Sequence, residues 1–123
     1  TSSTIDSIHR IIAEFSPDEQ ERIRYRLADV LKVVISQKLV PNKHNKLTLA
    51  KEVLSVDYSI QAAIRKGNIT ELFQMLTEGK SKGMFTMQQD LYRLYKAGII
   101  TVETAMNYCN NKKVMSNLLK YST

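Results

Sequence analysis

Hydrophobic residues near the start of the chain recur every three or four positions, which is the period of a helix with one buried face. The members of this stripe are Ile5, Ile8, Ile12 and Phe15. Either Ser2 or Ser3 can cap the segment, and Asp6 places a negative charge in the first turn, where the helix dipole favours it. We therefore expect a short first helix.

A second helix is predicted from the stretch Ser16-Pro17-Asp18-Glu19. Serine favours the cap position, proline suits the first helical position, and Glu19 would complete a capping box. The hydrophobic stripe that follows contains Ile23, Leu27, Val30, Leu31 and Val34. Three arginines, at positions 22, 24 and 26, fall mostly outside this stripe, so we interpret them as solvated.

From Val33 the pattern changes to β-branched residues, and a second extended run, LTLAKEVLSV, begins at Leu47. Two strands are therefore predicted. The connecting PNKHNK has a proline that cannot donate to a β-ladder and two asparagines that tolerate turns. Its lysines and histidine suggest a phosphate site, but phosphate cradles are normally rich in glycine and this loop has none. We interpret the loop as a solvated turn.

Beyond Val56 the chain is divided into short helices by cap residues and glycines. The predicted helices begin at Asp57, Asn68, Thr86, Thr101 and either Asn110 or Asn111, and the first three stop at Gly67, Gly79 and Gly98. Gly98 is expected in a left-handed conformation because the hydrophobic pattern restarts at Ile99 on a new axis. We interpret the methionines and aromatic residues of these helices as core.

Charge and composition restrict the class of protein but do not identify a partner. The 123 residues carry 18 Lys and Arg against 12 Asp and Glu, so the net charge of +6 favours acidic partners. The single Cys109 excludes an internal disulfide, and two distant histidines suggest no zinc cluster. No apolar stretch reaches the roughly 20 residues of a membrane span. We expect one cytoplasmic, mainly helical domain.

The familiar catalytic motifs are absent from the sequence. It contains no G-x-x-x-x-G-K-[ST], no G-x-G-x-x-G, no H-E-x-x-H, and no Cys or Ser paired with a nearby histidine. We therefore expect no catalytic residue, cofactor site or metal site in this chain, and no ATP hydrolysis by the chain alone.

The order of several short motifs resembles that of secretion and pilus-motor ATPases. STIDSIHRIIAEFSPDEQERIRYRLADVLKVVISQKLVP is similar to the family pattern STIDRII, FPPEQQ, IR, LA, L and VVSQ.LLP. The run from Gly83 to Thr101 resembles the pattern GM.TM.Q.L..L...G.IT. Because the shared order spans nearly the whole chain, the chain resembles the C-terminal portion of the PilT-like type IV pilus retraction family.

One segment, SIQAAIRKGN, resembles the AIRNLIREGK segment of that family, which couples nucleotide turnover to retraction. The resemblance therefore implies a coupling segment made of Ser59, Ile60, Ile64, Arg65 and Gly67. The chain departs from the family pattern at Gln61, Ala62 and Ala63. A simpler interpretation of Arg65 is that it only complements the negative end of the helix dipole.

The resemblance implies an α+β, mainly helical fold in two parts. Residues 1–56 would form the C-terminal edge of a RecA-like ATPase core with two short strands, and residues 57–123 a helical C-terminal region. The parent would be a hexameric ATPase at the inner face of the cytoplasmic membrane that drives pilus retraction and twitching motility with an inner-membrane platform protein. ATP and magnesium would bind elsewhere in the parent, and this chain would supply core packing, subunit contacts and coupling.

Two other classes stay open at this point. The net charge and the clusters Lys80-Ser81-Lys82 and Lys112-Lys113 are compatible with a nucleic-acid-binding module. Such modules normally place exposed aromatic residues among the basic ones, and the tyrosines here fall mostly on apolar stripes, so no nucleic-acid partner is expected. A helical adaptor without a motor parent is the other class, and the codons upstream of Thr1 would separate it from a motor. The Ser36-Gln37 pair and the AIRNLIRE-like segment favour a retraction motor over an extension or secretion motor.

Overall fold

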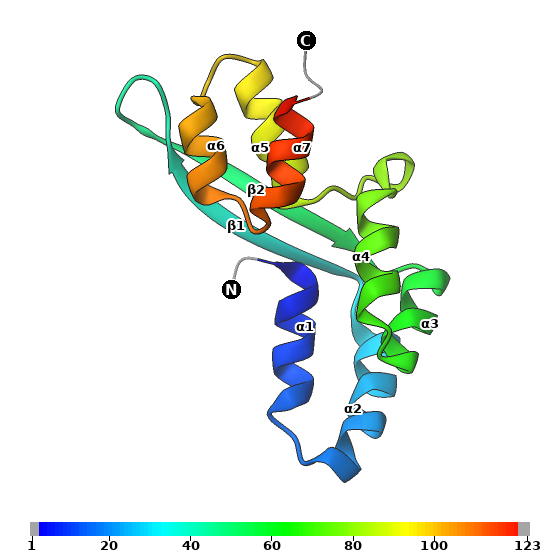
Figure 1. The fold of residues 1–123 in the computed structure, drawn as a ribbon. Helices are drawn as coiled ribbons and strands as arrows, with labels where there is room; N and C mark the ends of the chain where they lie inside the picture. Colours follow the sequence, from blue (N-terminus) through cyan, green and yellow to red (C-terminus); the bar gives the residue numbers. More distant parts are fainter. Residues whose placement is uncertain (1–2, 121–123) are drawn as a thin grey trace.

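The computed structural model describes residues 3–120, in which two helical lobes are joined by a long β-hairpin (Figure 1). The first lobe contains α1 (Thr4–Ala13), α2 (Pro17–Val30), α3 (Tyr58–Lys66) and α4 (Ile69–Thr77). The hairpin consists of β1 (Val33–Pro41) and β2 (Leu47–Ser55), and a short 3-10 helix, η1 (Lys80–Lys82), follows α4. The second lobe contains α5 (Met87–Lys96), α6 (Val102–Tyr108) and α7 (Lys112–Lys120). The predicted mainly helical α+β fold with two strands is confirmed.

Most predicted helix boundaries are confirmed by capping hydrogen bonds. The side chains of Ser3, Asp57, Asn68, Thr86 and Thr101 each accept a hydrogen bond from a backbone amide in the first turn of the helix that follows. Thr86 forms a complete capping box with Gln89. Gly98 has φ 77° and is left-handed, as predicted. Ser2, the alternative first cap, lies outside the described residues.

The prediction for the start of α2 is partly wrong. The helix begins at Pro17 as expected, but the Ser16 side chain makes no capping hydrogen bond. Glu19, the expected partner in the capping box, instead pairs with Arg22 at 3.5 Å. The helix ends at Val30, so Val34 lies in β1 and not on the predicted helical stripe.

The hairpin has one buried face and one exposed apolar face. Its strands pair antiparallel from Val33 opposite Ser55 to Pro41 opposite Leu47. Because side chains alternate across a strand, the even-numbered residues share the inner face. Buried inner-face residues are Ser36, Val40, Ala50, Glu52 and Leu54, and the exposed large apolar residues of the outer face are Val33, Ile35, Leu39, Leu47 and Leu49.

The loop that joins the two strands is a turn that also makes one backbone hydrogen bond to the second lobe, from Lys43 to the carbonyl of Ile99 at 3.0 Å. The Asn42 side-chain oxygen accepts hydrogen bonds from the backbone amides of His44, at 2.8 Å, and Lys46, at 3.1 Å. Asn45 adopts a positive φ of 59°. These two amides are used within the turn, so the interpretation of PNKHNK as a turn is confirmed.

Two separate hydrophobic cores hold the lobes. The first contains residues of α1 to α4 and the end of β2, including Ile5, Ile8, Leu54, Ile60, Ile64 and Leu76. The second contains residues of α5 to α7 and of the hairpin tip, including Val40, Ala50, Met87, Leu91 and Met115. The predicted division at residue 56 follows the change from strands to helices, whereas the two cores divide between α4 and α5. Among the described helices, none is long and apolar enough to cross a membrane.

Candidate functional site

The predicted coupling segment forms α3 and the glycine that ends it. Asp57 caps the helix, and Gly67, at φ 69°, terminates it in a left-handed conformation. Ile60 and Ile64 are each only 1% exposed and belong to the core of the first lobe. Of the five predicted coupling residues, Ser59 and Arg65 therefore present the side chains that a partner can reach.

Arg65 makes specific contacts with α2. Its Nη2 lies 2.8 Å from Oδ1 of Asp29, and its guanidinium carbon lies 5.9 Å from the centre of the Tyr25 ring. The backbone carbonyl of Arg65 also accepts a hydrogen bond from Nε of Arg24 at 3.1 Å. The guanidinium is thus held in one orientation between a carboxylate and an aromatic ring, which a pure dipole interaction would not require.

Two further polar residues attach α3 to α2. Nε2 of Gln61, one of the departures from the family pattern, donates to the backbone carbonyl of Ala28 at 2.9 Å. Ala63, another departure, is fully buried in the core of the first lobe. Arg24 passes close to Gly67 and reaches Arg65, so its interpretation as a solvated arginine is wrong.

These contacts orient α3 more than they stabilise it. The Arg65 and Asp29 side chains are 34% and 66% exposed, and exposed ion pairs typically contribute about 0 to 1 kcal/mol. A cation over an aromatic ring at such a site adds roughly 0.5–1 kcal/mol. Arg65 can therefore be removed without unfolding the lobe, which is the property that a coupling residue needs for a clean test.

The start of α3 is tied to η1. The Asp57 carboxylate accepts from Nζ of Lys82 at 2.6 Å and from the backbone amide of Ile60 at 2.9 Å. The hydrogen bond with Lys82 is the main cause that holds the pKa of Asp57 below its usual value, with the Ile60 amide second. The two ends of α3 are thus anchored to different neighbours, Asp57 to η1 and Arg65 to α2.

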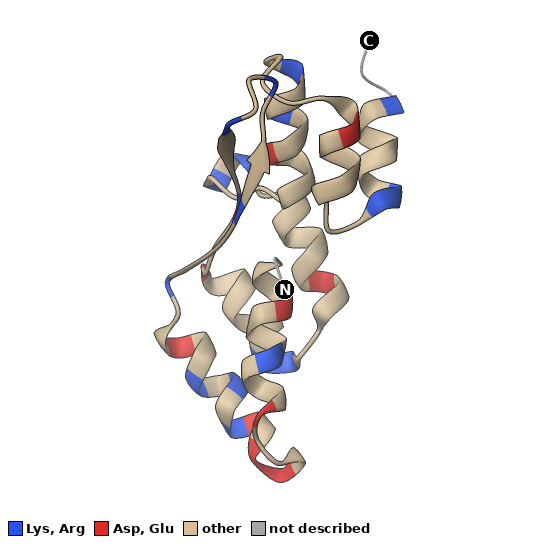
Figure 2. Cartoon of the chain, turned by 90° about the vertical axis from the view of Figure 1, so that its left-hand side faces the viewer, with Lys and Arg blue, Asp and Glu red and all other residues tan. Residues whose placement is uncertain are grey.

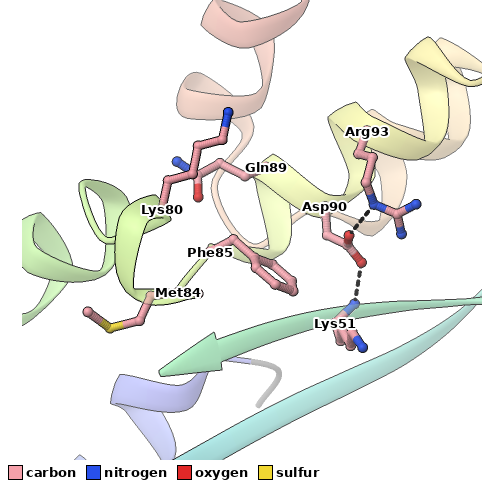
Figure 3. A pocket seen from close by; sticks show the side chains of 8 residues that line it. Lys51, Lys80, Met84, Phe85, Gln89, Asp90 and Arg93 are labelled. Carbon is pink, nitrogen blue, oxygen red and sulfur yellow. Dashed lines mark hydrogen bonds and ion pairs between the residues drawn. The ribbon is translucent and has the colours of Figure 1, made fainter. Parts of the chain in front are cut away.

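A basic hollow of about 620 Å³ lies between β2, η1 and α5 (Figure 3). Lys51, Lys80 and Arg93 line it beside the ring of Phe85. Its one carboxylate, Asp90, is 3% exposed and accepts from the Lys51 backbone amide at 2.8 Å and from Nε of Arg93 at 2.9 Å. Asp90 is therefore a structural acceptor that fixes α5 to the edge of β2.

Charge is distributed over the whole molecule. In the view of Figure 2, Lys and Arg occur on both lobes, and on the first lobe they are interspersed with Asp and Glu. Within residues 3–120, no group of three or more His, Cys, Asp or Glu side chains is arranged to hold a metal ion.

The contact partners of the coupling segment were not predicted from the sequence. Asp29 and Tyr25 belong to the second predicted helix, and no contact with another helix was predicted for either of them. Glu52, which is 2% exposed, was also missed. The available signal was its position in LTLAKEVLSV, where a charged residue falls on the same face of the strand as Ala50 and Leu54.

Comparison with known proteins shows similarity to pilus motors. The chain is 32% identical over 117 residues to a twitching motility protein of Neisseria gonorrhoeae and 30% identical over 115 residues to the type IV pilus ATPase PilU of Pseudomonas aeruginosa. These matches cover 94% and 93% of this chain, but only 31% and 30% of the two relatives. No protein-family model matches the chain.

The fold comparison agrees with the sequence comparison. A crystal structure of the pilus retraction motor PilT with bound ADP superposes with a TM-score of 0.85 at 34% identity, over 95% of this chain and 32% of that one. The chain thus spans about a third of the length of the proteins it matches. The family resemblance predicted from the sequence is therefore confirmed: the chain resembles the C-terminal portion of the PilT-like type IV pilus retraction ATPases.

Proposed function

We propose that the chain is the C-terminal portion of a hexameric motor ATPase that powers type IV pilus retraction. In this proposal it supplies core packing, subunit contacts and coupling, while other parts of the motor bind ATP and magnesium. The motor acts at the inner face of the cytoplasmic membrane with an inner-membrane platform protein, and nucleic acid is not a partner. The relatives named for twitching motility and pilus ATPases support this assignment.

The observation that supports the packing role is that only one edge of the hairpin is paired. The outer edge of β2 is already occupied, because Val53 exchanges both backbone hydrogen bonds with Phe85 and the Lys51 amide donates to Asp90. Val53 lies opposite Ile35 in the register, so the polar backbone groups of Ile35 point away from β2. In the described sheet, which has two strands only, nothing pairs with that edge of β1.

The exposed face of the hairpin also indicates that this surface is covered by another part of the motor. Leu39 and Leu47 are 61% and 63% exposed, and Val33 and Ile35 are 51% and 53% exposed. An open strand edge beside exposed apolar residues is a surface that proteins normally cover. We propose that the preceding part of the ATPase core covers it.

The test compares Leu39→Asp on this face with a matched control, Gln74→Asp at an exposed position of α4. Both positions are exposed in the chain. In the isolated chain, the free energy of unfolding of each variant should therefore lie within roughly 1 kcal/mol of that of the parent sequence. In the full-length motor, Leu39→Asp should abolish ring assembly and ATPase activity, because it places a charge in the proposed contact. Gln74→Asp places its charge outside the proposed contact and should leave both largely intact. Full ATPase activity in the Leu39→Asp motor would contradict the proposal.

A further inference from the structure

The inner face of β2 carries a buried carboxylate that the proposed coupling role does not use. Glu52 is 2% exposed. Its Oε2 accepts from the backbone amide of Thr4 at 2.6 Å and from the Thr4 hydroxyl at 2.8 Å, and its Oε1 accepts from the backbone amide of Met87 at 3.0 Å. Among the described residues, no Lys, Arg or His forms an ion pair with it.

The three donors belong to the first residues of two helices in different lobes. Thr4 opens α1 in the first lobe, and Met87 opens α5 in the second. A helix N-terminus carries unpaired amides and a partial positive charge, so two such ends can hold a carboxylate that has no basic partner. The carboxylate in turn joins the two helix ends at one point.

The hairpin also contacts the C-terminal end of a helix, through a basic side chain. Lys38 lies on the same inner face and donates from Nζ to the backbone carbonyl of Tyr108, the last residue of α6. Burial is the main cause that lowers the pKa of Lys38, and the charge of Glu52 partly opposes this shift. Lys38 attaches the hairpin to the second lobe only, whereas Glu52 attaches it to both lobes.

The backbone hydrogen bonds between Val53 and Phe85 and the one from Lys51 to Asp90 tie β2 to the start of the second lobe, but few contacts join the helices of the two lobes directly. Their hydrophobic cores are separate, and the extensive contacts between helices lie within each lobe. A hollow of about 280 Å³ separates the start of α1 and the end of α4 from α5 and α7, with Glu52 among its lining residues. One exposed hydrogen bond, from Nε2 of Gln89 to the carbonyl of Thr77 at 2.9 Å, also crosses between the lobes.

From this geometry we propose that Glu52 is the joint that sets the orientation of the α5–α7 lobe relative to the α1–α4 lobe. The joint depends on two carboxylate oxygens that both accept. An amide has one accepting oxygen, and its NH₂ group would face an N–H donor. Glu52→Gln must therefore lose the hydrogen bond from the Met87 amide or the one from the Thr4 amide, whichever way the side chain turns, while the side-chain volume is nearly unchanged.

The experiment measures distances between spin labels in the chain itself, in a Cys109→Ser background. Labels at Gln74→Cys in α4 and Ser116→Cys in α7 report on the two lobes, and labels at Gln74→Cys and Glu21→Cys report on the first lobe alone; all three positions are exposed. Glu52→Gln should broaden and shift the interlobe distance distribution and leave the intralobe distribution unchanged. The matched control Glu103→Gln, an exposed carboxylate on α6, should change neither.

A second variant covers the case in which Glu52→Gln does not fold. Thr4→Val removes the hydroxyl donor on the α1 side only and keeps the side-chain volume, so it should broaden the interlobe distribution by a smaller amount. An interlobe distribution identical to wild type in folded Glu52→Gln, or in Thr4→Val if Glu52→Gln does not fold, would overturn the proposal. Broadening of both label pairs would do so as well, because it would mean that Glu52 supports the first lobe and not the joint.

Discussion

Gly79 is the glycine whose replacement the structure predicts to be most damaging. Its backbone, at φ −88° and ψ 19°, suits any residue, so Gly79→Ala causes no backbone strain. The added Cβ would lie 2.7 Å from both Cβ and Cε of Met84 and 3.0 Å from the carbonyl oxygen of Met75. Two of these three atoms are fixed by the backbone and cannot rotate away, so α4 or the segment after η1 must shift.

The expected cost follows from these contacts. Overpacking of a buried site typically costs about 1–3 kcal/mol, and alanine recovers roughly 0.4–1 kcal/mol by restricting the unfolded chain. Since real Cβ atoms essentially never show contacts of 2.7 Å, the overpacking cost lies near the upper end of its range. We therefore expect Gly79→Ala to lower the free energy of unfolding by a net amount of about 2 kcal/mol, which for a domain of this size lowers the melting temperature by roughly 6–10 °C.

Gly98→Ala is the matched control for Gly79→Ala. Gly98 has φ +77° and open space around its Cα, so an added methyl group meets no atom within 4 Å. The left-handed backbone costs alanine about 1–2 kcal/mol, less the same unfolded-state gain, which leaves about 1 kcal/mol or less. Urea and thermal denaturation of both variants would show which substitution lowers the free energy of unfolding more. If Gly98→Ala were the more destabilising of the two, the packing described around Met84 would be wrong.

Three further predictions concern the isolated chain. Gly98→Val should destabilise it by on the order of 1 kcal/mol or more through backbone strain, and an unchanged melting temperature would argue against the left-handed assignment. The pKa of Asp57 is held below its usual 3.8, mainly by Lys82, so this stabilisation is present at neutral pH and is lost as pH falls through the lowered value. Lys82→Met should therefore be most destabilising near neutrality, and a cost that stays constant down to pH 2 would refute this. Purified chain should show no magnesium-dependent ATP turnover, and measurable turnover would contradict the absence of a phosphate loop.

The sequence predicted local structure well because caps and glycines act over a few residues. Thr86 with Gln89, Asp57 and Gly98 each specify a helix end by chemistry that neighbouring residues complete. The capping box predicted at Ser16 does not form. Its expected partner, Glu19, had more than one possible local partner, and it pairs with Arg22 instead.

Long-range contacts could not be predicted in the same way. Glu52 meets Thr4 and Met87 across 48 and 35 residues of chain, and no spacing rule relates these positions. Arg65 meets Asp29 across 36 residues for the same reason. The coupling segment is predicted from resemblance to a family, and the residues that contact Arg65 were found only in the fold.

The most direct test of the account is Arg65→Ala in the full-length motor, with the exposed neighbour Lys66→Ala as the control. We predict that Arg65→Ala assembles and hydrolyses ATP at nearly the normal rate but does not retract pili, because coupling needs the orientation fixed by Asp29 and Tyr25 and hydrolysis does not. Lys66→Ala should retain both activities. Normal retraction by Arg65→Ala would contradict the coupling role, and loss of ATP hydrolysis together with retraction would contradict it too, by placing Arg65 in the support of the core or ring.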